Sequence, residues 1–147
     1  MAGTRMTEAE IKRVFRNLLS AKKAYDSAYY QMMEAMCDSL HSVVITDMPT
    51  APGDHDKIGV SYERREQSVQ LCKRYQIQYE ALLSLSYDLL ECARDTIGIS
   101  VILQRWMNDD PASWDDIAER LQIDRRSVFR HYSNAIKEMA EGYKNVI

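Results

Sequence analysis

The sequence predicts an all-α protein built from a long antiparallel helical hairpin over residues 1–95 and a helix-turn-helix unit over residues 96–147. Turn-forming residues are sparse, with 5 Gly and 3 Pro in 147 residues. A β-sandwich needs a turn about every 8–12 residues, so this sparseness favours long helices. Apolar residues also recur at helical spacing, and N-terminal capping patterns precede several of the apolar runs.

The first predicted helix starts near residue 8, after a capping box formed by Thr7 and Glu10. No Pro or Gly follows before Pro49, so the helix is expected to continue to about residue 46. A single helix this long cannot bury its apolar face alone and needs a partner helix. The residues of this face are Ile11, Phe15, Leu18, Tyr25, Tyr29, Met32, Met36 and Val43.

The main loop is predicted at about residues 46–59, which hold two of the three prolines and two of the five glycines. A second helical stripe follows this loop, and the two stripes are expected to pack against each other as an antiparallel hairpin. The second stripe consists of Val69, Cys72, Tyr75, Tyr79, Leu82, Leu83, Ser86, Leu89, Leu90 and Ala93.

Three shorter helices are predicted after residue 95. The first covers residues 96–107, and the second begins after a capping box, Ser113 to Asp116, and ends at Leu121. After a three-residue break, Asp124 caps a last helix that runs to about residue 141. Two helices joined by so short a turn indicate a helix-turn-helix. Its inward positions are predicted to be Ile117, Ala118, Leu121, Ile123, Val128, one of His131 and Tyr132, and one of Ala135 and Ile136.

Charge is distributed unevenly along the chain. The protein has 19 Lys and Arg against 22 Asp and Glu, so its net charge of -3 excludes nucleic-acid binding through a globally basic surface. The last helix differs, because residues 125–137 hold four cations and no acid. Arginine paired with guanine is the commonest specific base contact, so this helix is a candidate DNA reader. An ordinary solvated face is the alternative interpretation of the four cations, Arg125, Arg126, Arg130 and Lys137.

The segment from Ser113 to Met139 resembles region 4 of sigma-70-type factors, and within that class it is most similar to small phage transcription regulators of the RinA/ArpU-like type. The residues that carry the resemblance are Trp114, Ile117, Ala118, Leu121, Val128, Phe129, Arg130, Ala135 and Ile136. Leu103 to Trp106 and the loop Asp47-Met48-Pro49 are also similar to elements of that phage family. His131, Tyr132 and Asp124 depart from its usual residues.

This resemblance implies a sequence-specific DNA-binding regulator of a phage or prophage operon. It implies base reading by Arg125, Arg126 and Arg130. Ser127, Phe129 and Asn134 would lie nearer the DNA backbone, and Lys137 completes the expected DNA-binding set. RNA polymerase is a second expected partner.

Enzyme and membrane functions are not predicted. The three histidines and three cysteines show no ligand spacing, and no phosphate-binding or nucleophile motif occurs, so we expect no catalytic residue, cofactor or metal. No apolar run reaches about 18 residues and no signal peptide is evident, which favours the cytoplasm of a bacterial host without membrane contact.

Two other functions remain open from the sequence. One is a protein-interaction module that docks on RNA polymerase or another phage protein, and the other is a small terminase-like packaging subunit. A homodimer is expected in the DNA-binding case, because dimeric readers place two recognition helices one turn of DNA apart. Residues off the main stripes that are candidates for a second packing face are Tyr30, Met33, Leu71 and Leu85.

Overall fold

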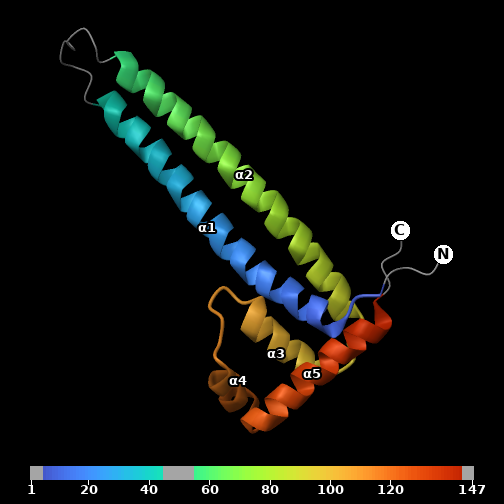
Figure 1. Cartoon of the computed structure of the whole chain (residues 1–147). Coiled ribbons are helices and arrows are strands. Elements are labelled where there is room, and N and C mark those ends of the chain that lie inside the picture. The colour runs from blue at the N-terminus through green and yellow to red at the C-terminus, as the bar shows by residue number, and fades with distance from the viewer. Residues whose placement is uncertain (1–4, 45–54, 144–147) are drawn as a thin grey trace. The chain divides into compact units, whose positions relative to one another are not determined.

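The computed structural model describes residues 5–44 and 55–143, with side chains described for residues 5–37 and 62–143. The described part consists of helices and their connections, as the all-α prediction requires (Figure 1). The helices are α1 (Glu8–Val44), α2 (His55–Glu91), α3 (Thr96–Trp106), α4 (Trp114–Leu121) and α5 (Arg125–Gly142).

Two predictions concern the connection between α1 and α2. Helix α2 begins at His55, so the predicted loop at 46–59 extends too far: residues 55–59 belong to the first turns of α2. The Asp47-Met48-Pro49 segment lies outside the described residues.

Side-chain caps define where the helices begin. The N–H of Glu10 donates to Oγ1 of Thr7 at 3.2 Å, and Oε2 of Glu10 accepts from the N–H of Thr7 at 3.3 Å. Oγ of Ser113 accepts from the N–H of Asp116 at 3.1 Å. These bonds satisfy N–H groups that have no partner inside the helix. The predicted capping box of Thr7 and Glu10 is therefore confirmed, and of the second box the cap by Ser113 is confirmed.

The described chain divides into two compact units, and the division does not follow the predicted boundary at residue 95. Unit 1 comprises residues 1–20 and 81–147, and unit 2 comprises residues 21–80. The reason is packing: the first turns of α1 and the last turns of α2 share one core with α3, α4 and α5. This core consists of Ile11, Val14, Phe15, Leu89, Leu90, Ala93, Val101, Ile102, Ala112, Ile117, Val128, Tyr132, Ala135, Ile136 and Met139.

Unit 2 contains the remaining parts of α1 and α2, which run side by side in opposite directions (Figure 1). The rings of Tyr25 and Tyr79 stack between the two helices, with centroids 6.0 Å apart and planes inclined by 4°. Ala28, Ala35 and Cys72 are its buried hydrophobic residues among those described.

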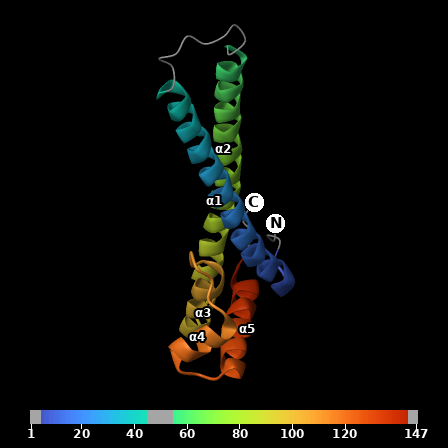
Figure 2. The same cartoon turned by 90° about the vertical axis from the view of Figure 1, so that its left-hand side faces the viewer.

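In unit 1, α5 packs along α3, and α4 contacts both (Figure 2). Gly98 permits this packing, because a Cβ at this position would lie 2.7 Å from Cβ of Ala135 and would also collide with the backbone carbonyl of His131. Ile117 and Val128 are fully buried, as predicted. Of the two alternatives at the next inward position, Tyr132 is the buried residue.

Candidate nucleic-acid interface

Three residues connect α4 to α5. Gln122 adopts a left-handed backbone conformation with φ of 57°, and the N–H of Ile123 donates to the carbonyl of Ala118 at 3.1 Å. Ile123 packs partly buried against the core of unit 1. The turn is therefore anchored to α4, and Arg125 and Arg126 at the start of α5 are exposed to solvent.

Asp124 caps α5. Its Oδ1 accepts from the N–H of Ser127 at 3.3 Å. Hydrogen bonds from Ser127, with a contribution from the charge of Arg126, lower the pKa of Asp124 below its ordinary value of 3.8. Ser127, predicted to lie near the DNA backbone, is thus part of the cap, and its side chain is half-buried.

An exposed face of α5 carries a stripe of four polar side chains. Positions 126, 130, 133 and 137 are separated by steps of 4, 3 and 4, which places them on one helical face. Three of them, Arg126, Arg130 and Lys137, were predicted as DNA-binding residues, and all are exposed. Ser133 was not predicted, although its spacing from the two arginines would have revealed it. We call these four residues the α5 stripe.

Arg125 and Phe129 lie outside the α5 stripe, on the side of α5 that faces α4. Nη1 of Arg125 is 3.5 Å from Oδ1 of Asp115, and its guanidinium lies 5.5 Å from the ring centroid of Phe129. The Phe129 ring packs against Trp114, with centroids 4.8 Å apart. The side chains of Arg125 and Asp115 are 57% and 76% exposed, so their ion pair contributes at most about 1 kcal/mol. Arg125 can therefore exchange this partner for another anion.

Asn134 contacts the start of α3. Its Nδ2 donates to Oδ2 of Asp95 at 3.1 Å, and Nδ1 of His131 lies 2.8 Å from the same oxygen. The other oxygen, Oδ1, accepts from the N–H of Gly98 at 3.1 Å and so caps α3. Burial tends to raise the pKa of Asp95, but the bonds from His131, Gly98 and Asn134 outweigh it and lower the pKa below 3.8. Asp95 thus ties α5 to α3, a role that local sequence patterns do not reveal.

We expect the stability that Asp95 contributes to depend on pH. Because its pKa is lowered in the folded state, the contribution is present above the ordinary value of 3.8 and is lost as pH falls through the folded pKa. Asp95→Asn should therefore destabilise unit 1 at neutral pH by about 1–3 kcal/mol, and the difference from the wild type should shrink in acid. Urea unfolding followed by circular dichroism, at neutral pH and in acid, measures the free energy of unfolding of the variant and of the wild type. Asp110→Asn, at an exposed acid, is the control; an equal loss for Asp95→Asn at both pH values would contradict the linkage.

A second polar cluster supports the loop before α3. Oε2 and Oε1 of Glu138 accept from the N–H groups of Arg94 and Asp95 at 3.1 and 3.0 Å. In a separate cluster, the guanidinium of Arg105 lies over the rings of Trp106 and Trp114, 5.1 and 5.4 Å from their centroids. Arg105 and Trp106 belong to the Leu103–Trp106 element, and these contacts give Arg105 a structural role between α3 and α4.

The charges around the candidate interface are mixed. A shallow depression of about 610 Å³ lies beside the α5 stripe, and acids and cations both line it. Its lining residues are Glu8, Asp95, Arg130, His131, Ser133, Asn134 and Lys137. Helix α4 exposes Asp115, Asp116 and Glu119. The α5 stripe is thus a local cationic surface beside an acidic helix.

Among the side chains that the structure describes, those of residues 5–37 and 62–143, no group of three His, Cys, Asp or Glu is placed to hold a metal ion. No helix in the described part of the chain is long and apolar enough to cross a membrane. No family model matches the chain, and no match was found among curated proteins or solved structures.

Proposed function

We propose that the chain is a sequence-specific DNA-binding transcription regulator of phage or prophage origin that reads double-stranded DNA with α5 in the bacterial cytoplasm. The observation that carries the proposal is the α5 stripe. Its three cations are exposed on one face of a helix that follows a three-residue turn, in a segment without an acid from residue 125 to 137.

The positions along α5 suggest different roles for the cations. In helix-turn-helix proteins, the N-terminal residues of the second helix contact base edges. Arg126 and Arg130 occupy the first two turns of α5, so they are the proposed base readers, with Arg125 beside them. Lys137 lies two turns further along, where a phosphate is the proposed contact.

The acids of α4 constrain how DNA can approach. The first helix of such a motif commonly crosses the DNA backbone. Asp115 and Asp116 at the start of α4 would repel phosphates there. We therefore propose that α5 enters the major groove while the start of α4 stays away from the backbone.

The test is the triple variant Arg126→Ala, Arg130→Ala, Lys137→Ala. Duplexes are first selected from a random pool with the wild-type protein, and affinity for them is then measured by fluorescence anisotropy across a salt series. Each base-reading arginine lost should weaken binding to the selected duplex by about 1–3 kcal/mol. Each lost phosphate contact should reduce the salt slope by about 0.9.

The chain offers a matched control. Arg64→Ala, Lys73→Ala, Arg74→Ala also removes two arginines and one lysine, from exposed positions of α2. This control should bind the selected duplex like the wild type. If both triple variants lose the same affinity, only net charge matters and the reading role of α5 is wrong.

A second candidate function is a protein-interaction module that docks on RNA polymerase or another phage protein. The exposed acids of α4 favour it, because Asp115, Asp116 and Glu119 suit a basic protein surface better than a phosphate backbone. Asp115→Asn with Asp116→Asn distinguishes the two candidates. The double variant should bind DNA more tightly if α5 reads DNA, whereas it should bind purified polymerase more weakly if α4 is a docking surface.

A further inference from the structure

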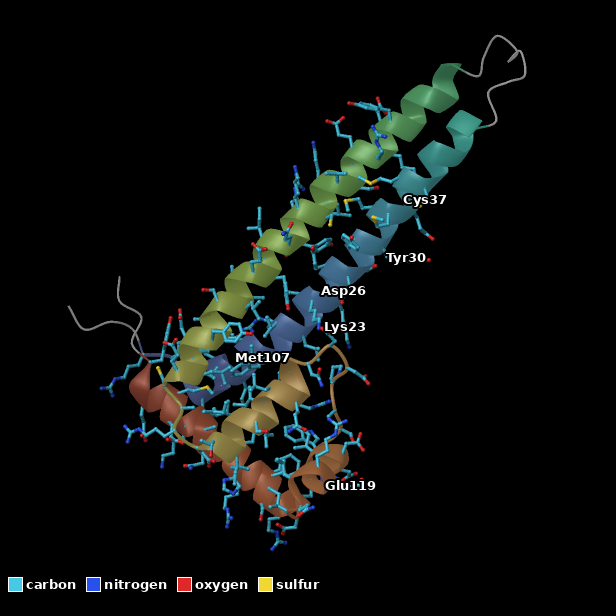
Figure 3. All side chains as sticks on the ribbon, turned by 180° about the vertical axis from the view of Figure 1, so that it is seen from behind. Lys23, Asp26, Tyr30, Cys37, Met107 and Glu119 are labelled. Atoms are coloured by element: carbon cyan, nitrogen blue, oxygen red, sulfur yellow. The ribbon has the colours of Figure 1, made fainter. Side chains whose placement is uncertain are left out.

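A stripe of exposed residues with heptad spacing runs along α1 within unit 2. Residues 23, 26, 30, 33 and 37 follow steps of 3, 4, 3 and 4, and all are exposed. Figure 3 shows four of its members, Lys23, Asp26, Tyr30 and Cys37, in succession along α1. Tyr30 is 65% exposed and Met33 is 42% exposed. Such spacing is typical of the seam between two paired helices. We call these five residues the α1 outer stripe.

The α1 outer stripe lies away from the contact between α1 and α2. That contact uses Ala28 and Ala35 of α1, which are buried. The exposed large apolar residues of α2 in unit 2, Tyr62, Leu71 and Ile77, are nine and six positions apart, so they do not follow steps of 3 and 4 and form no comparable stripe. A two-helix layer buries little, and α1 carries the outer face that is suited to a further helix.

We infer that the α1 outer stripe pairs with the same stripe of a second copy of this chain, with the two α1 helices antiparallel. Charge complementarity selects the partner and its direction. A parallel pair in register would place Lys23 against Lys23 and Asp26 against Asp26, which are unfavourable like-charge contacts. An antiparallel pair around a twofold axis near residue 28 places Lys23 opposite Met33 and Asp26 opposite Tyr30.

This antiparallel register gives every charged group of the stripe a counterpart. The hydroxyl of Tyr30 can donate to the carboxylate of Asp26 in the second copy. The ammonium of Lys23 reaches Glu34, which is exposed and follows Met33. The twofold axis repeats both contacts, as an isologous interface requires. This dimer contact involves unit 2 alone and does not depend on DNA binding.

The first test compares Tyr30→Glu with Ile77→Glu by sedimentation equilibrium, with circular dichroism to verify helicity. The two side chains are 65% and 67% exposed, but only Tyr30 belongs to the α1 outer stripe. Tyr30→Glu places a carboxylate against Asp26 of the second copy and should weaken dimerisation at least tenfold, whereas Ile77→Glu should leave it unchanged. A wild-type protein that is monomeric at micromolar concentration, or an equal loss in both variants, would overturn the proposal.

Charge reversal tests the register. Lys23→Glu and Glu34→Lys should each weaken the dimer by about tenfold, which corresponds to about 1.4 kcal/mol. The double variant should recover most of the lost affinity, because both pairs are restored with opposite polarity. Additive losses in the double variant would exclude contact between these two residues.

Cys37 reports the direction of the helices. In the antiparallel register the two Cys37 residues lie about 27 Å apart along the axis, at about 1.5 Å per residue. A disulfide requires Cα atoms within about 7 Å. Mild oxidation should therefore give no link between two Cys37 residues, as judged by peptide mass spectrometry. Efficient formation of that link would show a parallel pair and overturn the antiparallel arrangement.

Discussion

Phe15→Ala is expected to destabilise unit 1 by about 3–5 kcal/mol, the usual loss for a fully buried phenylalanine. Phe15 is 0% exposed and belongs to the same core as residues of α3, α4 and α5. Its removal leaves a cavity and also loses the burial of the ring. Urea unfolding followed by circular dichroism measures the change, provided that the transition of unit 1 is resolved from that of unit 2.

The second phenylalanine of the chain is the control. Phe129 is 38% exposed and packs on Trp114, so Phe129→Ala should be clearly less damaging than Phe15→Ala. Equal losses would mean that the start of α1 is not part of the core of unit 1.

A fragment limited to residues 96–147 should lack a stable fold, because Phe15 and the last turns of α2 belong to the core of unit 1 and the fragment omits them.

Gly98→Ala is expected to have the second largest effect, a loss of about 2–3 kcal/mol in unit 1. The added Cβ would meet Cβ of Ala135 at 2.7 Å and the backbone carbonyl of His131, and a backbone atom cannot move aside as a flexible side chain can. In an open helix the same change would stabilise by up to about 1 kcal/mol. Destabilisation by Gly98→Ala therefore reports the close approach of α3 and α5.

Gly142→Ala is the matched control, since its added Cβ would lie 3.2 Å from the side chain of Cys92. It should change thermal stability little, because the contact with Cβ of Cys92 is only slightly tight and a small shift of the end of α5 relieves it. A stabilising effect of Gly98→Ala would show that α3 and α5 do not pack as described. Comparing Gly98→Ala with Gly142→Ala also tests the proposed function. Gly98→Ala should displace α5 from α3 and so weaken DNA binding, although it alters no residue of the α5 stripe.

The helices and their ends could be predicted because their causes are local. Thr7 and Ser113 satisfy N–H groups within the next turn of the chain. The inward residues of α4 and α5 follow from helical spacing, and Ile117 and Val128 are buried as expected. Neither feature depends on parts of the chain that are distant in sequence.

The boundary of the units could not be predicted in the same way. The helical stripe of α1 continues from Ile11 to Met36 without a break. Nothing in that periodicity shows that Phe15 packs into the core of unit 1 while Ala28 packs within unit 2. Which surface covers a helical stripe depends on the elements that pack against it.

In the candidate site, too, sequence spacing is sufficient to find some residues, whereas the contacts of others depend on long-range packing. Arg126, Arg130 and Lys137 share an exposed face because helical geometry places them there, and sequence spacing is sufficient to find them. Arg125 and Asn134 are also exposed polar residues of α5, yet their side chains contact Asp115 and Asp95. Asp95 is 39 residues from Asn134 in the sequence. Local sequence thus specifies the helices, their caps and their faces. Long-range packing decides which polar side chains of α5 contact other helices and which remain exposed, because the residues that they contact come close only in the folded chain.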